Sequence, residues 1–187
     1  SFSLDAGIFL ERKGIMTSKL TQTLEPRIFY VKRAFKDQSQ LPDFDTELSQ
    51  PTYDLLFQDN RFIGDDRLSD LDRLSLAVTS RLIEEKSGRE ILSASIAHAV
   101  HFTPPLTNLH KSALENELNR FESNDSLLAL KVSSTLNPNW RINTNVIYDN
   151  ENHRLNNAYL GIRSNYKNNL SISLAYSYSK YPSRSYN

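Results

Sequence analysis

The chain has 187 residues, with 22 Lys and Arg against 22 Asp and Glu, no Cys and a mean hydropathy of −0.52. The balanced charge argues against a uniformly basic nucleic-acid-binding protein, and the absence of Cys excludes disulfides and Cys-ligated zinc. No run of roughly 18 or more apolar residues occurs, which excludes a helical membrane span on length. A transmembrane β-barrel remains compatible, because its two alternating faces average to a polar composition.

Residues 1–33 alternate apolar and polar side chains with the period of two that is typical of strands. We predict two strands here, one from Phe2 to Glu11 and one from Leu20 to Tyr30. Pro26 lies on the apolar face of the second strand and has no N–H to donate to a neighbour. This strand is therefore expected to be weakened or bulged at Pro26.

The polar face of the second strand carries two residues of opposite charge. Glu25 and Arg27 are two positions apart and therefore point to the same side of the strand. We expect them to form structural ion pairs with Arg81 or Asp5 on neighbouring strands.

The connection from Lys36 to Arg73 is far longer than the ~12–15 residues beyond which structureless loops become uncommon, and such loops usually form lids or binding surfaces. Its acidic residues supply the oxygen ligands that calcium prefers. They are Asp65, Asp66, Asp70 and Asp72. Because Arg67 and Arg73 are interleaved with them, a solvated, ion-paired loop is the favoured interpretation and a calcium site is the alternative.

Residues 74–102 predict a hairpin. Leu74 to Leu82 alternate up to a turn at residues 85–88, and the apolar face of the returning strand extends from Leu92 to Val100. His98 and His101 are three positions apart and lie on opposite faces of that strand, which argues against a shared metal ion.

A second long connection extends from Thr103 to Ser126. Within it, Leu114, Leu118 and Phe121 follow Asn108 at helical spacing, which predicts a short amphipathic helix.

Residues 127–180 predict a meander of four strands with short and longer connections in alternation. Short turns of Asn and Pro chemistry are expected at residues 137–139 and 167–169. The polar segment from Asp149 to Asn156 is expected to form a longer connection. The apolar faces of the strands begin at Leu128, Trp140, Ala158 and Leu170.

These segments give about eight antiparallel strands, so the chain is expected to be all-β. Short turns at one end and long loops at the other are typical of a transmembrane barrel with periplasmic turns and extracellular loops. A soluble sandwich with one wet face would also alternate. It is disfavoured because its strands would usually have about five or six residues, fewer than the roughly nine expected here.

The barrel hypothesis assigns a place to the aromatic and charged side chains. Trp140 and Tyr148 lie ~26 Å apart along one strand, or ~19 Å along the membrane normal at a tilt of ~45°, which approaches the ~25 Å between aromatic girdles. The predicted membrane-interface aromatics are Tyr30, Trp140, Tyr148, Tyr166, Tyr176 and Tyr178. The predicted lumen-facing charged residues are Glu25, Arg27, Arg81, Lys131, Arg141 and Arg163.

No constellation for catalysis is found in the sequence. The Ser residues lack a Gly-x-Ser-x-Gly elbow, and five Gly residues disfavour a Gly-rich phosphate cradle. We therefore expect no enzymatic activity, no cofactor and no metal.

Several segments share their residue pattern with a known family. They are residues 22–30 (QTLEPRIFY), Asp37–Ser39, Pro42–Asp45, Tyr53–Phe62, Gly64 and Asp66–Arg67. This pattern resembles LptD (also called OstA or Imp), the family of lipopolysaccharide-assembly proteins of the Gram-negative outer membrane. The resemblance covers mainly residues 18–102, and a TPNW-type turn is echoed further on at Leu136–Trp140.

The resemblance implies that residues 1–187 are part of one barrel domain, a section of about eight strands from a larger barrel. In that family the barrel joins a periplasmic jellyroll, is plugged by the lipoprotein LptE, and releases lipopolysaccharide (LPS) laterally into the outer leaflet. The expected partners are therefore LPS, LptE, the bridge protein LptA through the jellyroll, and outer-membrane lipids, with no nucleic acid. Family members carry paired Cys outside the matched portion, so an internal piece without Cys is expected.

By the same resemblance, the connection 36–73 is an extracellular lid over the lumen. The residues expected to order it, and secondarily to contact substrate, are Tyr53, Asp54, Phe57, Asp59, Arg61, Asp65 and Arg67. Two alternatives stay open. One is a self-contained, eight-stranded outer-membrane barrel or porin-like protein, since eight strands can close, and the other is a soluble carbohydrate-binding sandwich.

Overall fold

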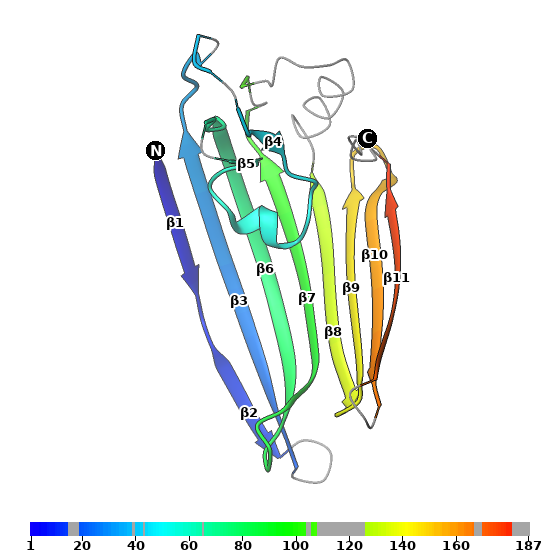
Figure 1. Ribbon diagram of the computed structural model, residues 1–187. Helices are drawn as coiled ribbons and strands as arrows, with labels where there is room; N and C mark the ends of the chain where they lie inside the picture. Colours follow the sequence, from blue (N-terminus) through cyan, green and yellow to red (C-terminus); the bar gives the residue numbers. More distant parts are fainter. Residues whose placement is uncertain are drawn as a thin grey trace.

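The segments with a period of two form one antiparallel sheet in the computed structural model of the chain (Figure 1). The structure describes residues 1–14, 19–38, 40–42, 44–64, 66–103, 106–107, 126–166 and 170–180. The sheet comprises β1 (Phe2–Gly7), β2 (Leu10–Gly14), β3 (Leu20–Arg33), β6 (Leu71–Glu84), β7 (Glu90–His101), β8 (Leu127–Asn137), β9 (Trp140–Asp149), β10 (Arg154–Asn165) and β11 (Ser171–Ser179).

The strands follow one another across the sheet in the order β1-β3-β6-β7-β8-β9-β10-β11, and β2 pairs with β3 beside β1. The expected all-β antiparallel class is confirmed. Within the described residues the sheet is open, with β1 and β2 on one edge and β11 on the other. These strands therefore form a section of curved wall rather than a closed eight-stranded barrel.

The described sheet has nine strands instead of eight because the first predicted strand is divided at Ile8 and Phe9. The carbonyl of Pro26 accepts the Ile8 N–H at 3.0 Å, but Pro26 has no N–H to return. Toward β6 the ladder passes Pro26 without a register shift, since successive residues of an antiparallel strand bond to alternate neighbours. The strand that contains Pro26, which was expected to be weakened or bulged, continues from Leu20 to Arg33 without a bulge, and the interruption lies in its partner strand at the sheet edge.

The two longest connections leave the same end of the sheet, and tight turns lie at the other end (Figure 1). The predicted long connection from Asp149 to Asn156 is wrong in length, because β10 already begins at Arg154. The buried Asp149 carboxylate closes the turn by accepting the N–H groups of Glu151 and Asn152 at 3.1 and 2.9 Å. The predicted helix with Leu114, Leu118 and Phe121 and the turn at residues 167–169 lie outside the described residues.

The two faces of the sheet differ in what covers them. One face exposes an apolar band that includes Ile28, Val78 and Ile96, which are 40%, 41% and 50% exposed. The opposite face is buried near the loop end by the connection between β3 and β6. No helix among the described residues is long and apolar enough to cross a membrane.

Candidate functional site

The connection between β3 and β6, residues 34–70, folds back over one face of the sheet (Figure 1). We call it the lid. It contains a two-stranded ladder of β4 (Glu47–Leu48) and β5 (Phe62–Ile63), with a single 3-10 turn, η1 (Asp54–Phe57), between them.

The turn η1 packs onto a shallow apolar patch of the sheet. Leu56 is 1% exposed and belongs to one cluster with Ala77, Ala97 and Ala129. These three alanines are aligned across β6, β7 and β8 by the strand register. Their small side chains leave room for η1, so the larger side chain of the lid fills the space above them.

Arginine side chains hold the backbone of the lid from both of its ends. Arg33, at the end of β3, donates to the carbonyl of Asp59 at 2.9 Å and to that of Ser69 at 3.3 Å. Arg73, near the start of β6, donates to the carbonyls of Leu55 and Gln58 at 3.1 and 2.6 Å. Loop carbonyls have no ladder partner and still require a donor when buried, and a guanidinium supplies five.

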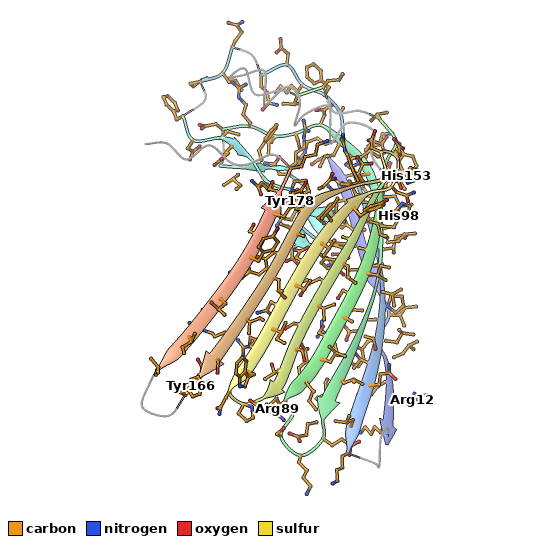
Figure 2. The ribbon with its side chains drawn as sticks, turned by 90° about the vertical axis from the view of Figure 1, so that its right-hand side faces the viewer. Arg12, Arg89, His98, His153, Tyr166 and Tyr178 are labelled. Atoms are coloured by element: carbon orange, nitrogen blue, oxygen red, sulfur yellow. The ribbon has the colours of Figure 1, made fainter. Side chains whose placement is uncertain are left out.

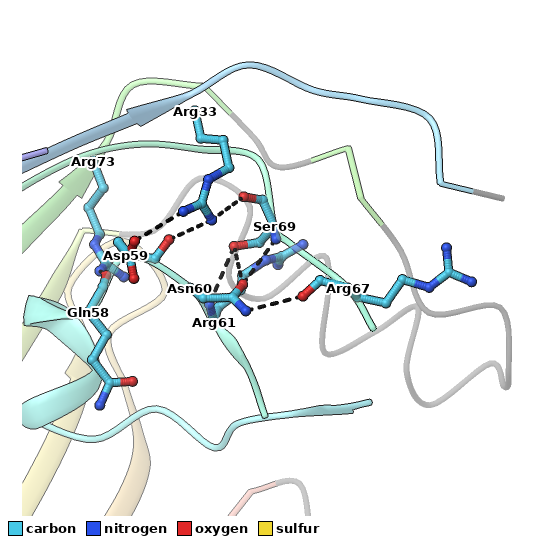
Figure 3. A network of polar contacts seen from close by, with 8 residues as sticks. All are labelled: Arg33, Gln58, Asp59, Asn60, Arg61, Arg67, Ser69 and Arg73. Atoms are coloured by element: carbon cyan, nitrogen blue, oxygen red, sulfur yellow. Dashed lines mark hydrogen bonds and ion pairs between the residues drawn. The ribbon is translucent and has the colours of Figure 1, made fainter. Parts of the chain in front are cut away.

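Inside the lid, the side chains of Asn60 and Ser69 link residues 60–61 to residues 67–69 by hydrogen bonds. The Asn60 side-chain carbonyl accepts the N–H of Ser69 at 3.0 Å, and the Ser69 hydroxyl accepts the N–H of Arg61 at 3.3 Å (Figure 3). Arg67 donates to the carbonyls of Gln38 and Leu41. The expected pairing of this arginine with loop carboxylates is thus replaced, in these bonds, by carbonyl acceptors.

Polar contacts also join η1 to the wall. The Lys131 ammonium on β8 lies 2.8 Å from both carboxylate oxygens of Asp54 and 5.6 Å from the centre of the Tyr53 ring. The Arg27 guanidinium lies 4.5 Å from the centre of the Phe57 ring. The predicted lid residues Tyr53, Asp54 and Phe57 therefore touch predicted lumen-facing charges.

A cavity of about 480 Å³ lies beside these contacts. Its walls include Glu25, Arg27, Arg81, Lys131 and the hydroxyls of Thr79 and Ser95. Arg27 pairs with Asp5, and Arg81 pairs with Glu25 at 3.3 Å. The ion pairs expected from the sequence are confirmed, and the paired charges leave the cavity lining without an excess of either sign.

The strand register places the six predicted lumen-facing charges on one face, the face that the lid covers. Glu25, Arg27, Arg81 and Lys131 lie near the lid. Arg141 and Arg163 are directly opposite each other on β9 and β10, further toward the turn end.

The predicted interface aromatics on strands occupy the opposite face. They are Tyr30, Trp140, Tyr148, Tyr176 and Tyr178, and Tyr166 directly follows β10. Tyr166 and Tyr176 are 53% and 65% exposed. Figure 2 shows Tyr178 near the loop end and Tyr166 at the turn end, so the aromatics occur at both ends of the strands.

The acidic residues of the connection predicted at residues 36–73 have separate partners, and one of them, Asp72, lies in β6. Asp66 accepts the N–H groups of Phe44 and Asp45, which lowers its pKa. Asp72 accepts the Tyr30 hydroxyl at 3.0 Å and pairs with Lys32. Across the described part of the chain, no group of His, Asp and Glu is arranged to hold a metal ion, and Asp65 lies outside the described residues.

Asp70 is buried and reaches a different loop. It accepts the N–H groups of Leu106 and Thr107 at 2.7 and 2.8 Å. Burial would raise its pKa, but these hydrogen bonds and one from the Thr107 hydroxyl lower it below the ordinary value. His98, for comparison, bonds to the Ser126 hydroxyl, and His101 points to the opposite face, as expected.

Several residues that organise the lid were not singled out by the sequence reasoning. They are Arg33, Asn60, Ser69 and Thr107. Arg73 was expected to contribute to an ion-paired loop, but its bonds to the carbonyls of the lid were not predicted. A signal existed for Arg33, because it flanks the long connection and, like Arg73 at the other end, shares the strand face of Glu25 and Arg27.

The sequence was also compared with known proteins. The model of the family described as LPS transport system D, LptD, matches residues 1–187. This chain belongs to the LptD family. The resemblance expected from the segments around residues 22–30 and 53–67 is thereby confirmed, and it extends beyond residues 18–102 to the whole chain.

Curated LptD relatives show how much of a family member's length this chain covers. LPS-assembly protein LptD of Polaromonas sp. strain JS666 is 34% identical over 179 residues, which cover 94% of this chain and 21% of the relative. The protein of the same name from Thiobacillus denitrificans is 38% identical over 152 residues, which cover 81% and 20%. That of Alcanivorax borkumensis is 46% identical over 101 residues, which cover 54% and 13%. The chain thus spans about a fifth or less of these relatives.

Proposed function

We propose that this chain forms a section of the wall, together with a lid, of an outer-membrane translocon that inserts LPS into the outer leaflet. The observation that supports this most is the difference between the two faces of the sheet. One face presents an apolar band with aromatics at both ends, as a lipid-facing barrel wall does. The other presents paired charges and hydroxyls beneath the lid.

The relatives are named LPS-assembly protein LptD, and the family is described as LPS transport system D. These names are the reason for proposing LPS as the substrate. LPS, the plug lipoprotein LptE, the bridge protein LptA acting through a jellyroll, and outer-membrane lipids are the proposed partners. The proposed role is transport and assembly without covalent chemistry.

The lid is proposed to lie on the extracellular side and to close the lumen. Its test is deletion of Pro42–Phe62 in the full-length protein, with a short Gly/Ser linker in its place. We expect the strands to stay folded, because they are joined by their own ladders, while cells become permeable to bulky antibiotics or lose surface LPS.

The matched control keeps the lid length and replaces Ile63, which is 59% exposed, by Ser. This variant should behave as the parent does. Unchanged permeability and unchanged surface LPS in the deletion variant, at parental protein levels in the outer membrane, would overturn the proposed lid.

A further inference from the structure

Two loops that leave the same end of the sheet meet at Thr107. Asp70 is the last residue of the lid before β6, and Thr107 belongs to the connection that follows β7. The Asp70 carboxylate accepts the N–H of Leu106 on one oxygen at 2.7 Å and that of Thr107 on the other at 2.8 Å. The Asp70 N–H is also 3.4 Å from the Thr107 hydroxyl oxygen.

A second lid residue holds Thr107 from another direction. The Arg61 guanidinium donates to the Thr107 carbonyl at 2.6 Å. Arg61, Asp70 and Thr107 are 3%, 8% and 5% exposed. The backbone N–H, the carbonyl and the hydroxyl of Thr107 are therefore all engaged by the lid, away from solvent.

The burial makes this contact more consequential than a surface hydrogen bond. A buried carboxylate is costly unless hydrogen bonds compensate for its lost hydration, and two of the donors that compensate Asp70 are amides of the second loop. If Leu106 and Thr107 move away, the closed lid retains a buried Asp70 charge without these donors. If the lid leaves, the amides of Leu106 and Thr107 lose their acceptors.

From this geometry we infer that the lid and Leu106–Thr107 open and close as one unit, with Asp70 and Arg61 as the latch. Coupling of this kind is reciprocal, since each side changes the opening equilibrium of the other by the same factor. The latch extends the proposed lid function, because whatever passes the lid must also displace Leu106 and Thr107.

The test measures deuterium exchange of individual amides in the full-length protein, purified in detergent. Asp70→Asn keeps the shape and removes the charge that accepts two amides. We expect exchange at Leu106 and Thr107 to accelerate about tenfold or more, as befits the loss of hydrogen bonds to a charged group.

Asp66→Asn is the matched control, because Asp66 also accepts two amides but within the lid, from Phe44 and Asp45. It should accelerate exchange at those two amides and leave Leu106 and Thr107 unchanged. If Asp70→Asn accelerates Leu106 and Thr107 no more than Asp66→Asn does, the latch is overturned.

The reciprocal variant, Thr107→Val, removes the hydroxyl and keeps the size. We expect faster exchange in the lid, at Asp70 and at the Arg61 and Ser69 amides, whereas Thr103→Val on the exposed part of the same loop should change none of them. An unaltered lid in Thr107→Val would contradict the coupling. These readouts are independent of permeability, so a lid that proves irrelevant to transport would refute the proposed function and leave the latch standing.

Discussion

Strands β7 and β11 both alternate in sequence, β11 the more regularly, yet they have opposite environments. In β7, Ala97 and Ala99 are 2% and 0% exposed beneath the lid. In β11, residues 171–178 are exposed on both faces. The small inward-facing residues of β11, Ser173, Ala175 and Ser177, would accommodate a packed loop as well as those of β7 do.

The comparison shows that alternation assigns residues to faces but does not decide which stretch of a face is buried. That is decided by where the lid is anchored. Arg33, Arg73 and Lys131 attach it to β3, β6 and β8, so η1 is positioned over the alanines of β6, β7 and β8 and leaves β11 uncovered.

The largest loss of burial at β7 is expected when the apolar contact of the lid with the sheet is removed. Leu56→Ala leaves a hole over the alanine patch and should favour lid opening by about 2–5 kcal/mol. The rate at which a protease cleaves the lid of the full-length protein measures this. Ile63→Ala, in the same lid but exposed, should have little effect, and equal cleavage of the two variants would contradict the packing described here.

The lipid-facing assignment of β11 is tested by a charge on each of its faces. Leu174→Arg, on the apolar face and further from the interface than Trp140, should lower the free energy of unfolding in lipid vesicles by up to roughly 2–4 kcal/mol if its face meets lipid, while Ser173→Arg should be tolerated. Urea titration of the two variants measures the difference. Equal losses at both positions would refute the assignment of faces.

The smallest expected change in stability comes from making the same substitution in β7 and in β11. Ala97→Leu overfills the patch beneath η1 and should cost about 1–3 kcal/mol, seen as faster proteolysis of the lid. The same change at Ala175 of β11 has open space above it and should stay within about 0.5 kcal/mol. A large effect at Ala175 would show that this part of the face is also covered.

Much of the sheet could be predicted because successive residues of a strand point to opposite faces, so the position of a residue along the strand decides its face. Glu25 and Arg27, two apart, had to share a face, and the pairing with Arg81 and Asp5 followed once the strands were neighbours. Pro26 indicated an irregularity because it lacks an N–H, but the division of its partner strand at Ile8 and Phe9 was not predicted.

The lid could not be predicted in the same way. Its arginines bind backbone carbonyls, and every residue carries a carbonyl, so no sequence pattern marks Leu55 or Gln58 as the acceptors for Arg73. The alanines at 77, 97 and 129 are unremarkable in sequence until the register aligns them. The short turn after β9 depends on one buried carboxylate, that of Asp149, in a segment whose polar composition was equally compatible with a longer loop.

The arginine anchors have a consequence for the dependence of the lid on ionic strength. The guanidinium groups of Arg33, Arg67 and Arg73 are held by carbonyl dipoles at short range, so the backbone of the lid acts as a solvation shell for its own cations. Mobile ions weaken attraction between separated, exposed charges much more than they weaken such buried contacts. The parts of the lid held by Arg67 and Arg73 should therefore keep their shape when external salt changes, whereas added salt should weaken the exposed Asp54–Lys131 and Asp59–Arg33 ion pairs.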